Sequence, residues 1–110
     1  MKTAKRKQLE AAGWKVGSAQ AFLGLSDQEA AFVELKLALG SYVRRYRTKR
    51  RWTQTALAAR LGSSQSRVAK VEAGDATVSL DLQVRALLAL GGGPRDVAKA
   101  LKDVEVPASA

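Results

Sequence analysis

The chain of 110 residues is long enough for one domain with a modest hydrophobic core. It contains no cysteine and no histidine, which excludes disulfides and thiolate metal sites and removes most nucleophile–base pairs. Because these residue types are missing, we expect a protein that is not an enzyme and has no cofactor-binding or metal site. No segment has the length and hydropathy of a membrane span, so we also expect the protein to be soluble and cytoplasmic.

The first third of the chain predicts short helices interrupted by glycines. Residues 1–12 begin with a basic run and favour helix, and a second short helix at residues 19–23 would follow a Ser18 cap. The basic run fits a solvated, frayed terminus better than an arm that contacts DNA. The large apolar residues of this segment need a cover, which either the main domain or a partner would supply.

Residues 27–49 predict one long helix. Ser26 and Glu29 fit a capping box at its start, and apolar residues recur at steps of three and four as far as Tyr46. Gly40 lies in the middle of the helix and costs about 1 kcal/mol relative to alanine. Two helices with a kink are therefore the alternative to the single helix that we favour.

Two short helices follow, and the first spans residues 54–61. Thr53 is a good N-cap because its hydroxyl can accept a hydrogen bond from an amide of the first turn. Trp52 and Leu57 stand at the positions of a hydrophobic staple, and Gly62 tolerates the left-handed conformation at the helix exit. The residues that we expect to be buried are Leu57, Ala58 and Leu61.

The second short helix spans residues 65–72, with Ser64 as its cap and Gly74 at its end. Its inner face consists of Val68 and Val71. Two helices of about two turns each, joined by a glycine-containing turn, match the helix-turn-helix that reads DNA. An ordinary helical hairpin in a small bundle is the alternative.

A further helix at residues 80–90 is capped by Ser79. Its inward residues are expected to be Leu80, Val84, Leu87 and Leu88. Leu82 and Leu90 exceed what one core face requires, and with the last helix they are candidates for a dimer surface.

Pro94 suits the first position of a last helix at residues 95–102. Val97 and Leu101 form its apolar face. Residues 103–110 are interpreted as a loose tail. No segment has the period of a strand, so the predicted fold class is all-α.

The charge of the chain is concentrated in one window. Its net charge is +9, and residues 44–70 contain nine basic residues and no acid, while the other ten basic residues are matched by ten acids. A solvated helix face mixes signs, so this window predicts a surface for a polyanion. Nucleic acid fits better than a membrane, because Tyr46 is the one apolar position between Arg44 and Arg51.

The exposed face of the helix at residues 65–72 carries hydrogen-bonding rather than acidic side chains. Glutamine can bond bidentately to adenine, and lysine can donate to guanine. The helix that begins at Gln54 can hold a phosphate through its unpaired amides. We expect phosphate contacts from Gln54, Lys49, Arg50, Arg51 and Arg67.

The segment from Arg47 to Gly91 contains Trp-Thr-Gln-x-x-Leu-Ala-x-x-Leu-Gly-Ser-Ser-Gln-Ser-x-Val-x-x-Val-Glu-x-Gly, followed by Ser-Leu-x-x-x-x-x-x-Leu-x-x-Leu-Gly. This pattern resembles the Cro and phage-repressor (XRE) helix-turn-helix family. The resemblance implies a five-helix lambda-repressor-like domain that binds double-stranded DNA and regulates transcription. We interpret the chain as a homodimeric repressor that reads a palindromic operator with two recognition helices.

The same resemblance implies roles for individual residues. It places Gln54 on a phosphate and Ser64 and Arg67 near the DNA backbone. The residues that it places at base edges are Gln65, Ser66 and Lys70. It also implies that Arg47 pairs with Glu72 inside the domain.

The N-terminal segment contains Leu-Glu-Ala-Ala-Gly-Trp-Lys-Val-Gly, then Phe-Leu-Gly-Leu-Ser. Taken together with the DNA-binding part, this pattern resembles small regulators encoded beside RelE/HigB-type toxins. This resemblance implies a HigA-type antitoxin, which covers its toxin and represses its own operon. Trp14, Phe22 and Phe32 fit toxin binding, but also packing on their own domain. A protein that coats nucleic acid without sequence preference is a third interpretation.

We divide the chain into a helical N-terminal extension at residues 1–34, a helix-turn-helix DNA-binding domain at residues 35–102, and the tail.

Overall fold

The computed structural model describes residues 23–102 and 104, and the expectations for residues 1–22, 103 and 105–110 lie outside that part. The described helices are α3 (Asp27–Lys49), α4 (Gln54–Leu61), α5 (Gln65–Ala73), α6 (Leu80–Ala89) and α7 (Pro94–Lys102). No strand occurs in the described part of the chain. The predicted all-α class is confirmed, and the helix bounds differ from the predicted ones by at most one residue.

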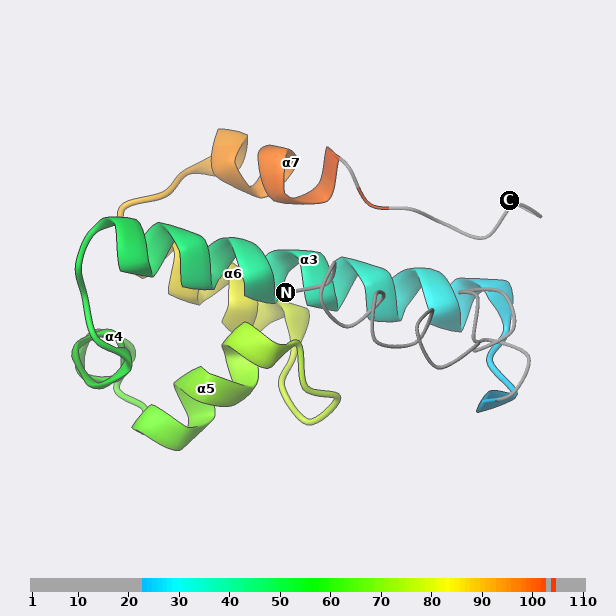
Figure 1. The fold of residues 1–110 in the computed structure, drawn as a ribbon, viewed down its shortest axis with the longest axis horizontal. Coiled ribbons are helices and arrows are strands. Elements are labelled where there is room, and N and C mark those ends of the chain that lie inside the picture. The colour runs from blue at the N-terminus through cyan, green and yellow to red at the C-terminus, as the bar shows by residue number, and fades with distance from the viewer. Residues whose placement is uncertain (1–22, 103, 105–110) are drawn as a thin grey trace, which may run out of the picture.

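Helix α3 is the axis of the fold: α7 lies along one side of it, and α4 and α5 lie on the other (Figure 1). The predicted single helix is confirmed, as is its capping box. Glu29 N donates to Ser26 Oγ over 3.1 Å, and Ser26 N donates to Glu29 Oε1 over 2.8 Å. The proposed boundary between residues 34 and 35 lies within this helix.

Gly40 allows the backbones of α3 and α5 to meet. A Cβ at Gly40 would lie 2.6 Å from the carbonyl oxygens of both Val71 and Glu72, a distance that no real Cβ contact tolerates. A glycine in mid-helix, which local propensity disfavours, is therefore required here by tertiary packing.

The predicted caps of the short helices are confirmed. Thr53, Ser64 and Ser79 each accept a hydrogen bond from the amide three residues later. Gly62 and Gly74 both have left-handed backbone conformations, with φ of 64° and 66°. These caps fix where α4 and α5 begin and end, and so fix the angle between them.

The core lies where α3, α4, α5 and α6 meet. Its buried residues are Val43, Leu57, Ala58, Val68, Val71, Val78, Ala86, Leu87 and Leu90. The predicted inner faces of the two short helices are confirmed, with Leu61 partly buried against this cluster.

The predicted orientation of α6 was wrong in part. Leu88 is 49% exposed, whereas Leu90 is 1% exposed and belongs to the core, so Leu90 is not available for a dimer surface. The reason is Gln83, which is fully buried and donates through Nε2 to the carbonyl oxygens of Lys36 and Val71. These bonds turn positions 83, 86, 87 and 90 inward.

Lys36 holds the loop between α5 and α6. Its side chain is buried, and Nζ donates to the carbonyl oxygen of Asp75 over 2.7 Å and to that of Val78. This contact ties the end of α5 to α3.

Candidate nucleic-acid interface

Helix α5 presents a polar outer face while its inner face is locked in the core. Val68 and Val71 are fully or almost fully buried. The side chains of Gln65, Ser66, Arg67 and Lys70 are exposed. This arrangement leaves four hydrogen-bonding side chains on a helix whose rotation is fixed by its two valines.

An ion pair behind α5 joins it to α3. Arg47 Nε lies 2.5 Å from Glu72 Oε2, and Arg47 Nη2 donates to Glu72 Oε1 over 3.1 Å. The two side chains are 11% and 4% exposed. Arg47 also donates to the carbonyl oxygen of Trp52 over 2.7 Å. The predicted Arg47–Glu72 pair is confirmed, and Arg47 is occupied inside the domain.

A chain of hydrogen bonds leads from this ion pair to the surface of α5. Gln54 Nε2 donates to Glu72 Oε1 over 3.0 Å, and Gln65 Nε2 donates to Gln54 Oε1 over 2.6 Å. The amide of Gln65 is therefore held at one edge, while its oxygen and its second N–H group remain available to a base or a phosphate.

Sequence reasoning placed Gln54 and Gln65 separately and did not connect them. Both glutamines occupy the first position of a helix, directly after the hydroxyl caps Thr53 and Ser64. This repeated cap–glutamine pattern is the sequence signal that could have paired them.

Two of the other predicted site residues, Ser64 and Ser66, lie together at the start of α5. Ser64 Oγ accepts from Arg67 N over 3.2 Å and lies 3.2 Å from Ser66 Oγ. Ser64 is therefore both the cap of α5 and part of a small hydroxyl cluster at its start. Lys70 lies on the last turn of the helix.

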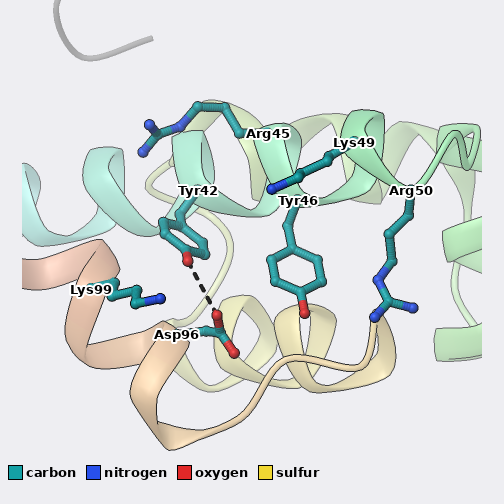
Figure 2. Close-up of a pocket in the computed structure, with 7 residues that line it drawn as sticks. All are labelled: Tyr42, Arg45, Tyr46, Lys49, Arg50, Asp96 and Lys99. Carbon is teal, nitrogen blue, oxygen red and sulfur yellow. Dashed lines mark hydrogen bonds between the residues drawn. The ribbon is translucent and has the colours of Figure 1, made fainter.

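Two other predicted cations occupy a different surface. Lys49 and Arg50 line a groove between α3 and α7 (Figure 2). The guanidinium of Arg50 lies 5.3 Å from the ring centre of Tyr46 and against Gly91 in the loop before α7. The structure therefore does not bring these two side chains together with those of α5.

Arg51 precedes α4, and Arg60 lies on its last turn. Arg51 has a φ of 62°, uncommon for a residue with a side chain, and forms the turn between α3 and α4. The guanidinium of Arg60 lies 5.0 Å from the ring centre of Trp52. Both side chains are exposed.

Residues 38–101 match a family model described as a helix-turn-helix domain, which covers the second half of α3 and nearly all of the chain from α4 to α7. No curated protein and no solved structure matches the chain. The arrangement of α3 to α7 is consistent with the lambda-repressor-like fold of such domains. Within the described residues, no helix is long and apolar enough to cross a membrane.

Proposed function

The chain belongs to the helix-turn-helix domain family, and on this premise we propose that it is a sequence-specific DNA-binding regulator that represses transcription. It acts as a homodimer on a palindromic operator, where two copies of α5 lie about one DNA turn, roughly 34 Å, apart.

The hydrogen-bonded series from Glu72 through Gln54 to Gln65 carries the proposal. A glutamine that reads a base must present its amide in one orientation, because its donor and acceptor edges specify different bases. The series restrains the side chain before DNA arrives and so lowers the entropic cost of the contact.

The proposed DNA-binding surface follows from this orientation. Gln65, Ser66 and Lys70 meet base edges. Phosphates are held by the residues around them: Gln54, Ser64, Arg67 and Arg51. Lys49 and Arg50 are left out, because they line the groove on the α7 side of α3.

The test begins with selection of binding sites from a random duplex library. We expect one enriched palindrome, to which the wild-type protein binds as a dimer in sedimentation analysis. Gln65→Ala should cost about 1–3 kcal/mol on that site and little on random duplex. The matched control is Gln28→Ala, an exposed glutamine at the start of α3, which should leave both affinities unchanged.

Two outcomes would contradict the proposal. Equal losses on selected and random DNA would show that Gln65 does not read bases. Failure to enrich any sequence would instead favour a protein that coats nucleic acid.

One observation favours the antitoxin alternative. Leu23, Phe32 and Val33, at the start of the described chain, are 64%, 47% and 43% exposed. Large apolar side chains exposed at the surface are candidates for a protein interface, and a RelE/HigB-type toxin would cover these three.

This alternative is tested by expressing the chain with such a toxin encoded beside its gene. We expect neutralisation of toxicity that Phe32→Asp abolishes and that Leu88→Asp, at an exposed leucine of α6, leaves intact. Undiminished toxicity with the wild-type chain would exclude this alternative for that toxin.

A further inference from the structure

A basic groove lies between the C-terminal half of α3 and α7. Its volume is about 690 Å³, within the range of roughly 300–1,000 Å³ of ligand sites. Tyr42 and Tyr46 line it from α3, and the Tyr42 hydroxyl points toward Asp96 of α7 (Figure 2). Four exposed cations line it: Arg45, Lys49, Arg50 and Lys99.

These cations have one acidic neighbour, Asp96, whose pKa the charges of Lys99 and Arg50 help to lower. Within the part of the chain that the structure describes, Arg47–Glu72 is the ion pair formed, and none of the four cations is within pairing distance of a carboxylate. Arg45 and Arg50 are stacked on the rings of Tyr42 and Tyr46, at 5.4 and 5.3 Å. Stacking orients a guanidinium but leaves its N–H groups at the ring edge free for an oxyanion.

The one acid of the groove is held by the fold. Asp96 Oδ1 accepts from the hydroxyl of Tyr42 over 3.2 Å, and Oδ2 accepts from the amide of Gly93 over 2.8 Å. These two bonds hold the carboxylate in place, and its single negative charge offsets only part of the charge of the four cations, so the groove keeps an excess of positive charge.

The groove faces away from the recognition helix. Helix α3 lies between α7 and α5 (Figure 1). A duplex bound along α5 would therefore leave the groove open. We propose that the groove binds an acidic, extended segment of a partner protein while α5 is on DNA.

The shape and chemistry of the groove favour a peptide over nucleic acid. A duplex is too wide to enter a space between two helices, whereas a single extended chain fits. The phosphodiester backbone of a nucleic acid offers only acceptors, so it has no hydrogen bond to give to Asp96. A peptide brings carboxylates for the cations together with N–H donors for the remaining lone pairs of Asp96.

The spacing of the cations also fits an extended chain. Arg45 and Lys49 are one helical turn apart, which places them roughly 6 Å from each other. Acidic residues two apart in an extended peptide lie on one face about 6.6 Å apart. Successive acids on one face of the segment would thus meet successive cations of α3.

The test uses the full chain and a fluorescein-labelled hexaglutamate peptide, followed by polarisation at about 0.1 M salt, where the Debye length is about 10 Å. Lys49→Gln/Lys99→Gln should weaken peptide binding by about fivefold or more. The matched control Arg67→Gln/Lys70→Gln removes the same charge from α5 and should change it less than about twofold. Circular dichroism checks that both variants are folded.

The outcomes separate the groove from general electrostatics. Equal weakening in both variants would show that net charge alone binds the peptide, and would overturn the proposal. Displacement of the peptide by a duplex would also overturn it, because it would place both ligands on one surface. Simultaneous binding of peptide and duplex would support it. The peptide measurements test the groove independently of the proposed function, because they do not require the chain to read a specific operator.

Discussion

Gly40 of α3 and Glu72 of α5 are in direct backbone contact: a Cβ at Gly40 would lie 2.6 Å from the carbonyl oxygen of Glu72. The contact brings α5 against α3 at the residue whose carboxylate holds both Arg47 and Gln54. The orientation of the exposed side chains of α5 therefore depends on the absence of one methyl group at Gly40.

The first prediction concerns this contact. Gly40→Ala should gain about 1 kcal/mol in helix propensity but lose more, about 1–3 kcal/mol net, because the added methyl must push the two backbones apart. Urea unfolding measures the difference. The control is Gly93→Ala, where a Cβ would meet nothing within 4 Å. Increased stability of Gly40→Ala would contradict the close approach.

The second prediction concerns the ion pair. Glu72→Ala should lower the free energy of unfolding by about 3 kcal/mol, because it leaves a largely buried guanidinium without its carboxylate. The double variant Arg47→Met/Glu72→Met should cost less than Glu72→Ala, since no buried charge remains. A melting temperature unchanged by Glu72→Ala would argue against the pair.

The third prediction concerns Gln54. Gln54→Ala should weaken binding to the selected operator by about 1 kcal/mol, because Gln65 loses the acceptor that holds its amide. Binding to random duplex should fall less than binding to the operator. Thermal stability should change little, because Glu72 keeps Arg47. Competition titrations measure the ratio of the affinity for the operator to the affinity for random duplex. If Gln54→Ala leaves this ratio unchanged, the hydrogen bonds from Glu72 through Gln54 do not position Gln65.

The fourth prediction separates the two basic surfaces. If Arg67 holds a phosphate, Arg67→Gln should reduce the slope of log affinity against log salt by about 0.9 per monomer. Lys49→Gln, which removes the same charge from the groove, should leave the slope nearly unchanged. An equal reduction in both variants would extend the DNA-binding surface to the α7 side of α3.

The fifth prediction concerns acid. The amide of Gly93 donates to Asp96, with smaller help from Tyr42, and these bonds hold the pKa of Asp96 below its usual range. The ionised form therefore stabilises the fold, fully so above the ordinary aspartate pKa of about 3.9. This contribution disappears as the pH falls through the lower folded-state pKa. Between neutral pH and acid, the melting temperature of Asp96→Asn should fall less than that of the wild type. If the melting temperatures of the two proteins fall in parallel, ionised Asp96 does not stabilise the fold.

The sequence predicted local structure well where local chemistry decides it. Ser26, Thr53 and Ser64 cap helices because a serine or threonine hydroxyl can accept from a first-turn amide. Gly62 and Gly74 end helices because glycine adopts the left-handed conformation there. Val68 and Val71 are buried because two apolar residues three apart define the inner face of so short a helix.

The prediction failed where a polar residue is buried or where a pattern is ambiguous. The apolar residues of α6 allow more than one inward face, and Gln83, which a hydropathy pattern assigns to the surface, decides between them by donating to Lys36 and Val71. That choice buries Leu90 and exposes Leu88.

By itself, the sequence determined the helices, their caps, the all-α class and the excess of positive charge in residues 44–70, because each depends on neighbours within a few residues. The family resemblance implied the Arg47–Glu72 pair, and the polar face of α5 indicated that Arg67 and Lys70 are exposed. Only the tertiary structure decided that Lys49 and Arg50 line a groove against α7, away from α5. Local sequence does not predict this, because which element packs against each face of α3 depends on contacts between residues far apart in the chain.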